Sequence, residues 1–367
     1  MKLLRAWPIV FLFLDACIDP LPVDIASGPS RLVVDGFITD KPGPYQVKLF
    51  YSSPVDNTTL RPLVESGASV WIIDDQNVSE VLAEVLPGVY QTSSSTFKGE
   101  VGKSYYVQIK TLSGNEYRSN VQRMEPAGTL DDLYVEFEKD GITQGNADKT
   151  LDAFRVYVDA HGNSGESNLF RWRWKGTYEA LTFPEKRVIN RPVGPPIPNP
   201  IPCSGYINNG GALTKIFECN CCSCWPSEFS SSSVVSGNRS SDDYIFNRAH
   251  VGTVPVTGMR FYDRFYIEVE QLSVSEGEYE FWRLANIQHE SSGNLFQPNA
   301  IRVHGNITSV SNPEEEVLGF FSVSAVEKKS MFIEKASIPV PIPALDSTAL
   351  ECISRYPGAA VEKPPFW

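Results

Sequence analysis

The chain has 367 residues, of which 42% are hydrophobic and 21% are charged, as in globular proteins. Its formal net charge of −12 repels phosphate backbones and no basic cluster stands out, which argues against nucleic acid as a partner. The length suggests two domains.

Residues 1–17 predict a signal peptide. Lys2 and Arg5 precede an apolar run, residues 6–14, that is too short to span a bilayer. The sequence Leu14-Asp15-Ala16-Cys17 resembles the lipobox of bacterial lipoproteins, although Asp15 departs from its usual small or apolar residue. The resemblance implies cleavage before Cys17 and lipidation of this cysteine, so that lipid attaches the protein to a membrane. An ordinary cleaved secretory leader is the alternative.

Residues 18–30 predict a tether, because the prolines at positions 20, 22 and 29 disfavour both helix and strand. Residues 31–124 then predict a β-sandwich of short strands separated by turn signals. The expected strands cover residues 31–38, 45–51, 68–73, 78–85, 88–92 and 104–111. The order Gly67-Ala68-Ser69-Val70, Gly88-Val89-Tyr90 and Gly102-Lys103-Ser104-Tyr105 resembles transthyretin-like or carboxypeptidase-regulatory-like sandwiches, which are mostly structural or recognition spacers.

Residues 127–335 predict a second β-rich domain, entered after Glu125-Pro126. Its clearest strand, residues 169–178, alternates large apolar residues with basic ones, and residues 265–270 alternate apolar residues with Tyr266, Glu268 and Glu270. The opposite charges of these two segments would suit neighbouring strands. Further strands are expected over residues 130–137, 153–160, 301–307, 317–326 and 330–333.

Six cysteines follow the leader: Cys203, Cys219, Cys221, Cys222, Cys224 and Cys352. Because an exported protein meets an oxidising compartment, we expect disulfides rather than a metal site, with zinc, iron–sulfur or redox roles as alternatives. We expect the adjacent Cys221 and Cys222 to bond to separate distant partners, such as Cys203 and Cys352. Residues 191–241 begin with closely spaced prolines and end in a serine run, so they predict a disulfide-stapled insertion.

One substantial helix is expected over residues 275–292. Ser275 is a candidate N-cap, and Glu278 three residues later predicts a capping box. Phe281 and Leu284 fall on the face expected to pack on the sheet. Residues 336–367 are rich in proline and predict an extended segment along the surface.

Aromatic side chains supply the candidate ligand contacts: Trp225 in the insertion, and Tyr279 and Trp282 on the helix. The four histidines stand in no metalloprotease or hydrolase motif, so we expect no catalytic residues, no metal and no cofactor. A pair of carboxylates that meet only in space remains the enzymatic alternative.

Several segments occur in a fixed order: Leu272-Ser273-Val274-Ser275, Glu278-Tyr279-Glu280-Phe281-Trp282, residues 293–298, Gly305-Asn306-Ile307 and Val317-Leu318-Gly319-Phe320-Phe321-Ser322. Together with Leu32-Val33-Val34-Asp35-Gly36 and Cys224-Trp225, they resemble a Bacteroidota lipoprotein family catalogued as domain of unknown function 4249. The resemblance implies an outer-membrane lipoprotein associated with TonB-dependent receptors. It provides no catalytic residues to transfer.

The sequence therefore predicts a non-catalytic, lipid-anchored outer-membrane protein that binds a ligand or partner as an accessory to a TonB-dependent receptor. A structural or adhesive surface lipoprotein is the first alternative, and a hydrolase acting on glycan or peptide is the second.

Overall fold

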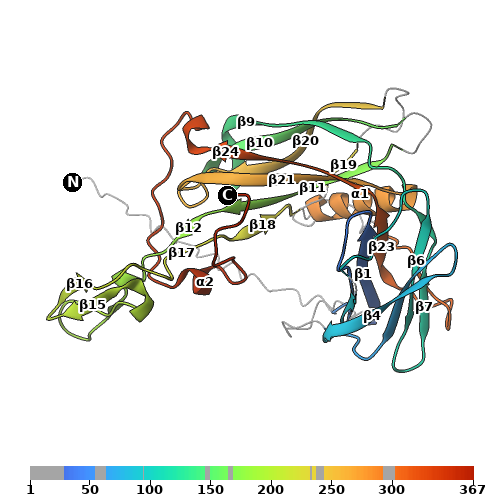
Figure 1. Cartoon of the computed structure of the whole chain (residues 1–367), viewed down its shortest axis with the longest axis horizontal. Helices are drawn as coiled ribbons and strands as arrows, with labels where there is room; N and C mark the ends of the chain where they lie inside the picture. The colour runs from blue at the N-terminus through green and yellow to red at the C-terminus, as the bar shows by residue number, and fades with distance from the viewer. Residues whose placement is uncertain are drawn as a thin grey trace, which may run out of the picture.

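The structure, a computed structural model, describes residues 29–53, 63–93, 95–144, 149–163, 168–231, 234–236, 244–291 and 302–367. The predicted signal peptide, Cys17 and the tether up to Gly28 lie outside these residues. Figure 1 shows two β-rich bodies with helix α1 (Glu276–Ser291) beside both, and an arm that projects from the second body away from the first. The predicted β-rich fold with one substantial helix is confirmed.

The first body is one sheet that folds around a single apolar core. Over the described residues it has ten strands in the order β22-β7-β6-β3-β4-β5-β2-β1-β23, with β8 paired to β6. The strands are β1 (Leu32–Thr39), β2 (Gln46–Tyr51), β3 (Ser69–Asp74), β4 (Ser79–Leu86), β5 (Val89–Thr92), β6 (Ser104–Lys110), β7 (Glu116–Ser119), β8 (Gln122–Arg123), β22 (Ile307–Ser309) and β23 (Leu318–Ser324). Buried and less buried residues alternate along β1 and β6, as period-two strands require.

Two strands of this sheet come from late in the chain. β23 pairs in parallel with β1, and β22 pairs antiparallel with β7. The sequence-based boundary at residues 124–127 assigned both to the second domain. The structure places them in the first body because Ile307, Phe321 and Val323 fill its core.

Asn306 joins the two ends of the sheet. Its side-chain amide donates to the carbonyl oxygen of Phe321 at 2.9 Å, and its side-chain oxygen accepts the Phe321 N–H at 2.9 Å. Its own carbonyl accepts the N–H of Asn120 at 2.8 Å. The Asn306 side chain therefore makes the two backbone contacts that a neighbouring strand would otherwise make at Phe321, where β22 and β23 meet. Asn306 and Phe321 are both buried.

Glycines permit this close approach. A Cβ added to Gly305 would lie 1.8 Å from the carbonyl oxygen of Gly319. Gly319 itself has φ +92°, and a Cβ there would lie 2.0 Å from the carbonyl oxygen of Val34. Both positions thus require glycine for backbone contact.

The second body packs two sheets face to face. One has the order β20-β10-β9, and the other has the order β18-β11-β21-β24 with β19 paired to β11. These strands are β9 (Thr129–Gln144), β10 (Lys149–His161), β11 (Phe170–Tyr178), β18 (Ser227–Phe229), β19 (Val234–Val235), β20 (Ile245–Pro255), β21 (Arg264–Ser273) and β24 (Val326–Glu334). Phe170 and Trp172 of β11 contact Phe246 of β20 across the core, with ring centroids 5.5 and 5.6 Å apart.

The two charged strands do pair, as their opposite charges allow. β11 lies antiparallel to β21, with Arg173 opposite Glu270 and Lys175 opposite Glu268. The apolar residues of β11 face the core, so its basic residues face the opposite side of the sheet.

Shorter elements form the arm, defined as residues 184–222, its two connections to the second body, and the C-terminal segment. They are β12 (Ala180–Leu181), β13 (Val188–Ile189), β14 (Ile197–Pro198), β15 (Tyr206–Asn209), β16 (Ala212–Lys215), β17 (Ser223–Cys224), α2 (Cys352–Arg355) and three 3₁₀ turns, Pro184–Lys186, Pro202–Ser204 and Lys335–Ser337. Tyr356, Ala359 and Trp367 of the C-terminal segment pack against the second core. In the described part of the chain, no helix has the length and apolarity needed to cross a bilayer.

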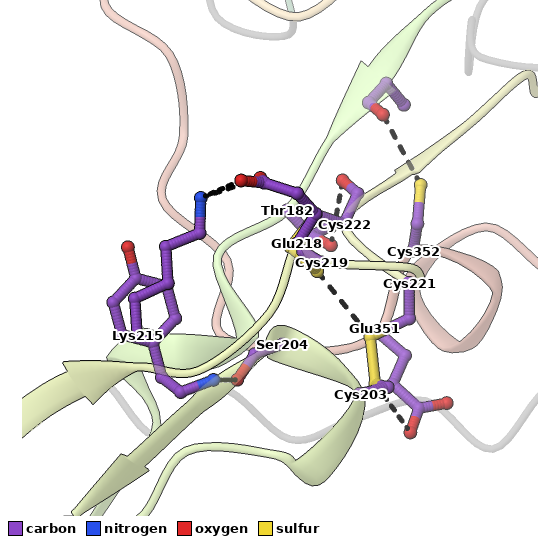
Figure 2. The surroundings of a disulfide bond; sticks show 12 residues. Thr182, Cys203, Ser204, Lys215, Glu218, Cys219, Cys221, Cys222, Glu351 and Cys352 are labelled. Carbon is purple, nitrogen blue, oxygen red and sulfur yellow. Dashed lines mark hydrogen bonds and ion pairs between the residues drawn. A yellow bond between two sulfur atoms is a disulfide. The ribbon is translucent and has the colours of Figure 1, made fainter.

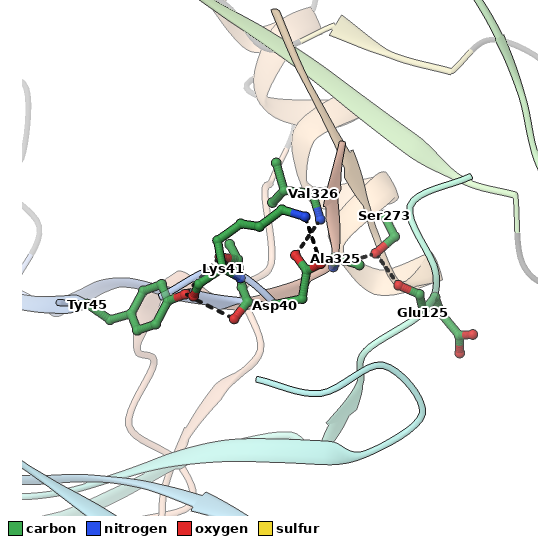
Figure 3. A network of polar contacts seen from close by, with 8 residues as sticks. Asp40, Lys41, Tyr45, Glu125, Ser273, Ala325 and Val326 are labelled. Atoms are coloured by element: carbon green, nitrogen blue, oxygen red, sulfur yellow. Dashed lines mark hydrogen bonds and ion pairs between the residues drawn. The ribbon is translucent and has the colours of Figure 1, made fainter. Parts of the chain in front are cut away.

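The two bodies are joined where β23 continues into β24 (Figure 3). Ser273, at the end of β21, donates its hydroxyl to the carbonyl oxygen of Glu125 at 2.6 Å and accepts the N–H of Ala325 at 2.9 Å. Asp40, just after β1, accepts the N–H of Val326 at 2.8 Å. These bonds satisfy backbone groups at the crossing and so fix one body against the other.

We expect Asn306→Ala to lower the free energy of unfolding by about 3 kcal/mol, because it leaves a buried N–H and a buried carbonyl of Phe321 without partners. Urea denaturation measures this loss. Asn312→Ala, at an exposed position after β22, is the control and should change stability by no more than about 0.5 kcal/mol. Equal losses for the two variants would contradict the role given to Asn306.

Candidate functional site

Helix α1 begins at a capping serine, as predicted. The Ser275 hydroxyl accepts the N–H of Glu278 at 3.2 Å. The predicted capping box is otherwise incomplete, because the Glu278 carboxylate points into the protein and makes bonds there. Sequence spacing identified the cap correctly but missed the role of this side chain.

Glu278 connects three elements through one buried oxygen. Its Oε1 accepts the hydroxyl of Ser322 on β23 at 2.8 Å and the indole N–H of Trp282 at 3.2 Å, and it lies 3.7 Å from Nη1 of Arg171 on β11. The side chains of Glu278 and Arg171 are only 1% and 6% exposed. Burial raises the pKa of Glu278 and lowers the pKa of Arg171, since it disfavours both charges, while their mutual attraction opposes both shifts.

A groove of about 490 Å³ lies at the junction that this pair supports. The outer face of β1, β2 and β23 forms one side, and α1 with β11 forms the other. Five aromatic rings line it: Phe37, Phe50, Phe281, Trp282 and Phe320. The groove therefore combines walls from both bodies. Helix α1, which supplies part of one wall, lies beside both bodies in Figure 1.

Two guanidinium groups lie against these rings. Arg171 sits 4.4 Å from the ring centroid of Trp282, and Arg173 sits 5.3 Å from that of Phe37. Arg173 also forms an ion pair with Glu270 at 2.5 Å. The carboxylate of Asp35, which is 63% exposed, is the acidic group that lines the groove.

The three aromatic ligand candidates lie in different environments. Trp282 lines the groove, whereas the neighbouring Tyr279 is buried at 6% exposure and does not line it. Trp225 lies elsewhere, in a backbone bridge to Ala360 of the C-terminal segment, with N–H to oxygen distances of 2.8 and 3.1 Å. Of these three candidates, only Trp282 lines the groove.

Sequence reasoning missed the residues that complete the groove. Arg171 and Arg173 were interpreted only as the charged side of a strand, and Phe37 was not singled out. Phe320 and Ser322 did lie in a segment that carried the family resemblance, as did Glu278 and Trp282. The family resemblance therefore marked residues on both sides of the groove, but only the fold shows that these segments meet.

The six cysteines beyond the leader form three disulfides: Cys203–Cys221, Cys219–Cys222 and Cys224–Cys352. The first two lie at the base of the arm, where Figure 2 shows them beside Glu351 and Cys352. The third is fully buried and ties the C-terminal segment to the second core.

The predicted pairing is correct for Cys221 and wrong for its neighbour. Cys222 bonds to Cys219 only three residues away, and Cys352 bonds to Cys224. The reason is burial: Cys224 lies on β17 inside the core that receives α2, whereas Cys222 remains partly exposed at the base of the arm.

Other titratable groups form surface contacts. His161 lies 2.7 Å from Asp131, and His250 lies 3.2 Å from Thr253. Among the described residues, no group of three or more His, Cys, Asp or Glu side chains is arranged to hold a metal ion.

A family described as Domain of unknown function (DUF4249) matches residues 18–330, most of the chain. The chain matches no curated protein. The matched range includes the first body, most of the second body, helix α1 and every residue that lines the groove.

We expect Glu278→Ala to destabilise the protein by about 3–5 kcal/mol, because it leaves the buried Arg171 charge uncompensated. The double variant Arg171→Met with Glu278→Leu should lose less stability than the sum of the losses of Arg171→Met alone and Glu278→Leu alone. A urea-denaturation cycle measures the coupling. Glu100→Ala, which removes an exposed pair with Lys103, should cost no more than about 1 kcal/mol, and additive losses at Arg171 and Glu278 would contradict the interpretation.

The disulfides should differ in their contribution to stability. Replacing Cys224 and Cys352 by alanine opens a link between residues 128 positions apart and should cost about 5 kcal/mol by loop entropy. Replacing Cys219 and Cys222, three positions apart, should cost about 2 kcal/mol. Thermal and chemical unfolding of both double variants tests the order, and the reverse order would contradict it.

Proposed function

From the finding that this chain belongs to the family described as Domain of unknown function (DUF4249), we propose that it is a binding protein of the outer membrane. In this proposal it is anchored by lipid at Cys17, is not an enzyme, and serves as an accessory to a TonB-dependent transporter. The junction groove is its site for a ligand or partner.

The groove is the observation that carries the binding role. Its volume of about 490 Å³ lies in the range of small-molecule sites, and five aromatic side chains line it. Both bodies and α1 contribute to it, so its shape depends on the whole fold. A site of this kind can hold an apolar group without performing chemistry on it.

The chemistry of the lining supports binding rather than catalysis. Among the described residues that line the groove there is no histidine or cysteine. Its serine, Ser322, donates its hydroxyl to Glu278 within the buried network. Its carboxylate, Asp35, is largely exposed and lies 4.0 Å from Lys48. These groups do not form a nucleophile with an adjacent base.

Cysteine use supports export and lipidation. Three disulfides are typical of proteins that fold in an oxidising compartment. They use six of the seven cysteines, which leaves Cys17 as the one thiol available for acylation. The basic and apolar leader before it supplies the export signal.

Replacing Cys17 by alanine should release the protein from the membrane fraction, because it removes the atom that would carry the lipid. Fractionation and mass spectrometry of the intact chain measure the change. An unacylated amino terminus on the unaltered protein would refute the anchor.

The tagged protein should co-purify with an outer-membrane barrel of the TonB-dependent class. Ala285→Trp fills the groove and should reduce the recovered barrel at least tenfold if the groove is the binding site. Ile287→Trp, on the same helix but outside the groove lining, is the matched control. Isolation of the unaltered protein as a lone monomer from solubilised membranes would count against the proposal.

A further inference from the structure

We propose that the groove takes an amphipathic acid, a small molecule with an apolar body and one carboxylate or similar anionic group. The inference rests on the groove being the binding site of the proposed function. It assigns the chemical class of the ligand from the walls and charges of that site.

The apolar part of the ligand would lie between two aromatic walls. Phe37 and Phe50 come from the outer face of the first body, while Phe281 and Trp282 come from α1. The ring centroid of Phe320, on β23, lies 5.1 Å from that of Phe281, so these two rings connect the two walls. A chain or ring lying between these surfaces would be removed from water on both faces.

The same rings argue against a cationic ligand. An aromatic cage attracts a cation through free ring faces, but here the faces of Trp282 and Phe37 already carry the guanidinium groups of Arg171 and Arg173. A second cation among these rings would meet like charges at short range. An anion would be attracted instead.

Arg173 is the group placed to meet the acid. Its side chain is 32% exposed, and its guanidinium lies at the Phe37 wall. Glu270 divides its carboxylate between Arg173 and Lys328, each at 2.5 Å, so this acid does not neutralise Arg173 alone. Lys328 has a second acid, Glu268, at 3.3 Å. Arg173 thus keeps donor capacity for a ligand oxygen.

Arg171 adds a second, buried positive charge to the wall that carries Arg173. Its Nε has no hydrogen-bond partner in the described part of the chain, and its paired carboxylate is 3.7 Å away and also bonds Ser322 and Trp282. The positive charge in this wall is therefore incompletely compensated, in a place where water screens little. Asp35 opposes it only weakly, because that carboxylate is exposed and near Lys48.

The test measures binding of three probes with the same chain length to the full chain carrying Cys17→Ser, which needs no lipid. The probes are dodecanoate, dodecanol and dodecyltrimethylammonium, used below the concentrations at which they form micelles. We expect dodecanoate to bind at least tenfold more tightly than dodecyltrimethylammonium, with dodecanol between them. Displacement of the fluorescent acid 1-anilinonaphthalene-8-sulfonate reports all three.

Variants locate the binding. Arg173→Gln should weaken dodecanoate roughly tenfold while leaving dodecanol nearly unchanged, since it removes one charge-assisted hydrogen bond. Arg118→Gln is the matched control, because its guanidinium also lies on a ring, Tyr106, but outside the groove. Ala285→Trp should abolish binding of every probe, and thermal melting checks that each variant is folded.

Equal affinity for the three probes, or binding of none, would overturn the ligand class. Equal losses for Arg173→Gln and Arg118→Gln would overturn its placement at Arg173. If dodecanoate fails to bind but Ala285→Trp still prevents co-purification with the barrel, the proposed function stands and only the ligand class fails. If dodecanoate binds and no barrel co-purifies, the ligand class stands and the role as accessory to a transporter fails.

Discussion

The contact between Glu278 and Arg171 is the constraint on which the junction depends. Two opposite charges that water hardly reaches must remain together, because separating them would leave either one buried alone. The carboxylate also accepts from Ser322 on β23 and Trp282 on α1. One side chain therefore sets the position of a helix against a strand from each body.

This arrangement explains why the groove has the shape it does. The apolar side of β11 faces the second core, so its basic side faces α1 and the first body. Arg171 becomes buried there, and Arg173 remains at the edge beside Phe37. A groove with aromatic walls and two guanidinium groups results from packing that also holds the bodies together.

The chain path reinforces the same junction. β22 and β23 return to complete the first sheet, and Asn306 joins its ends. β23 then passes directly into β24 of the second body, through the contacts of Ser273 and Asp40. The segments that carried the family resemblance lie largely along this path, which gives them a structural role.

The sequence by itself determined the local features. Period-two patterns predicted the strands, and Ser275 marked the start of α1, because these depend on neighbours within a few residues. Only the tertiary structure decided the return of β23 to β1, the pairing of Cys352 and the burial of Glu278. Each of these joins residues far apart in the chain, and their meeting depends on how whole sheets pack rather than on any local pattern.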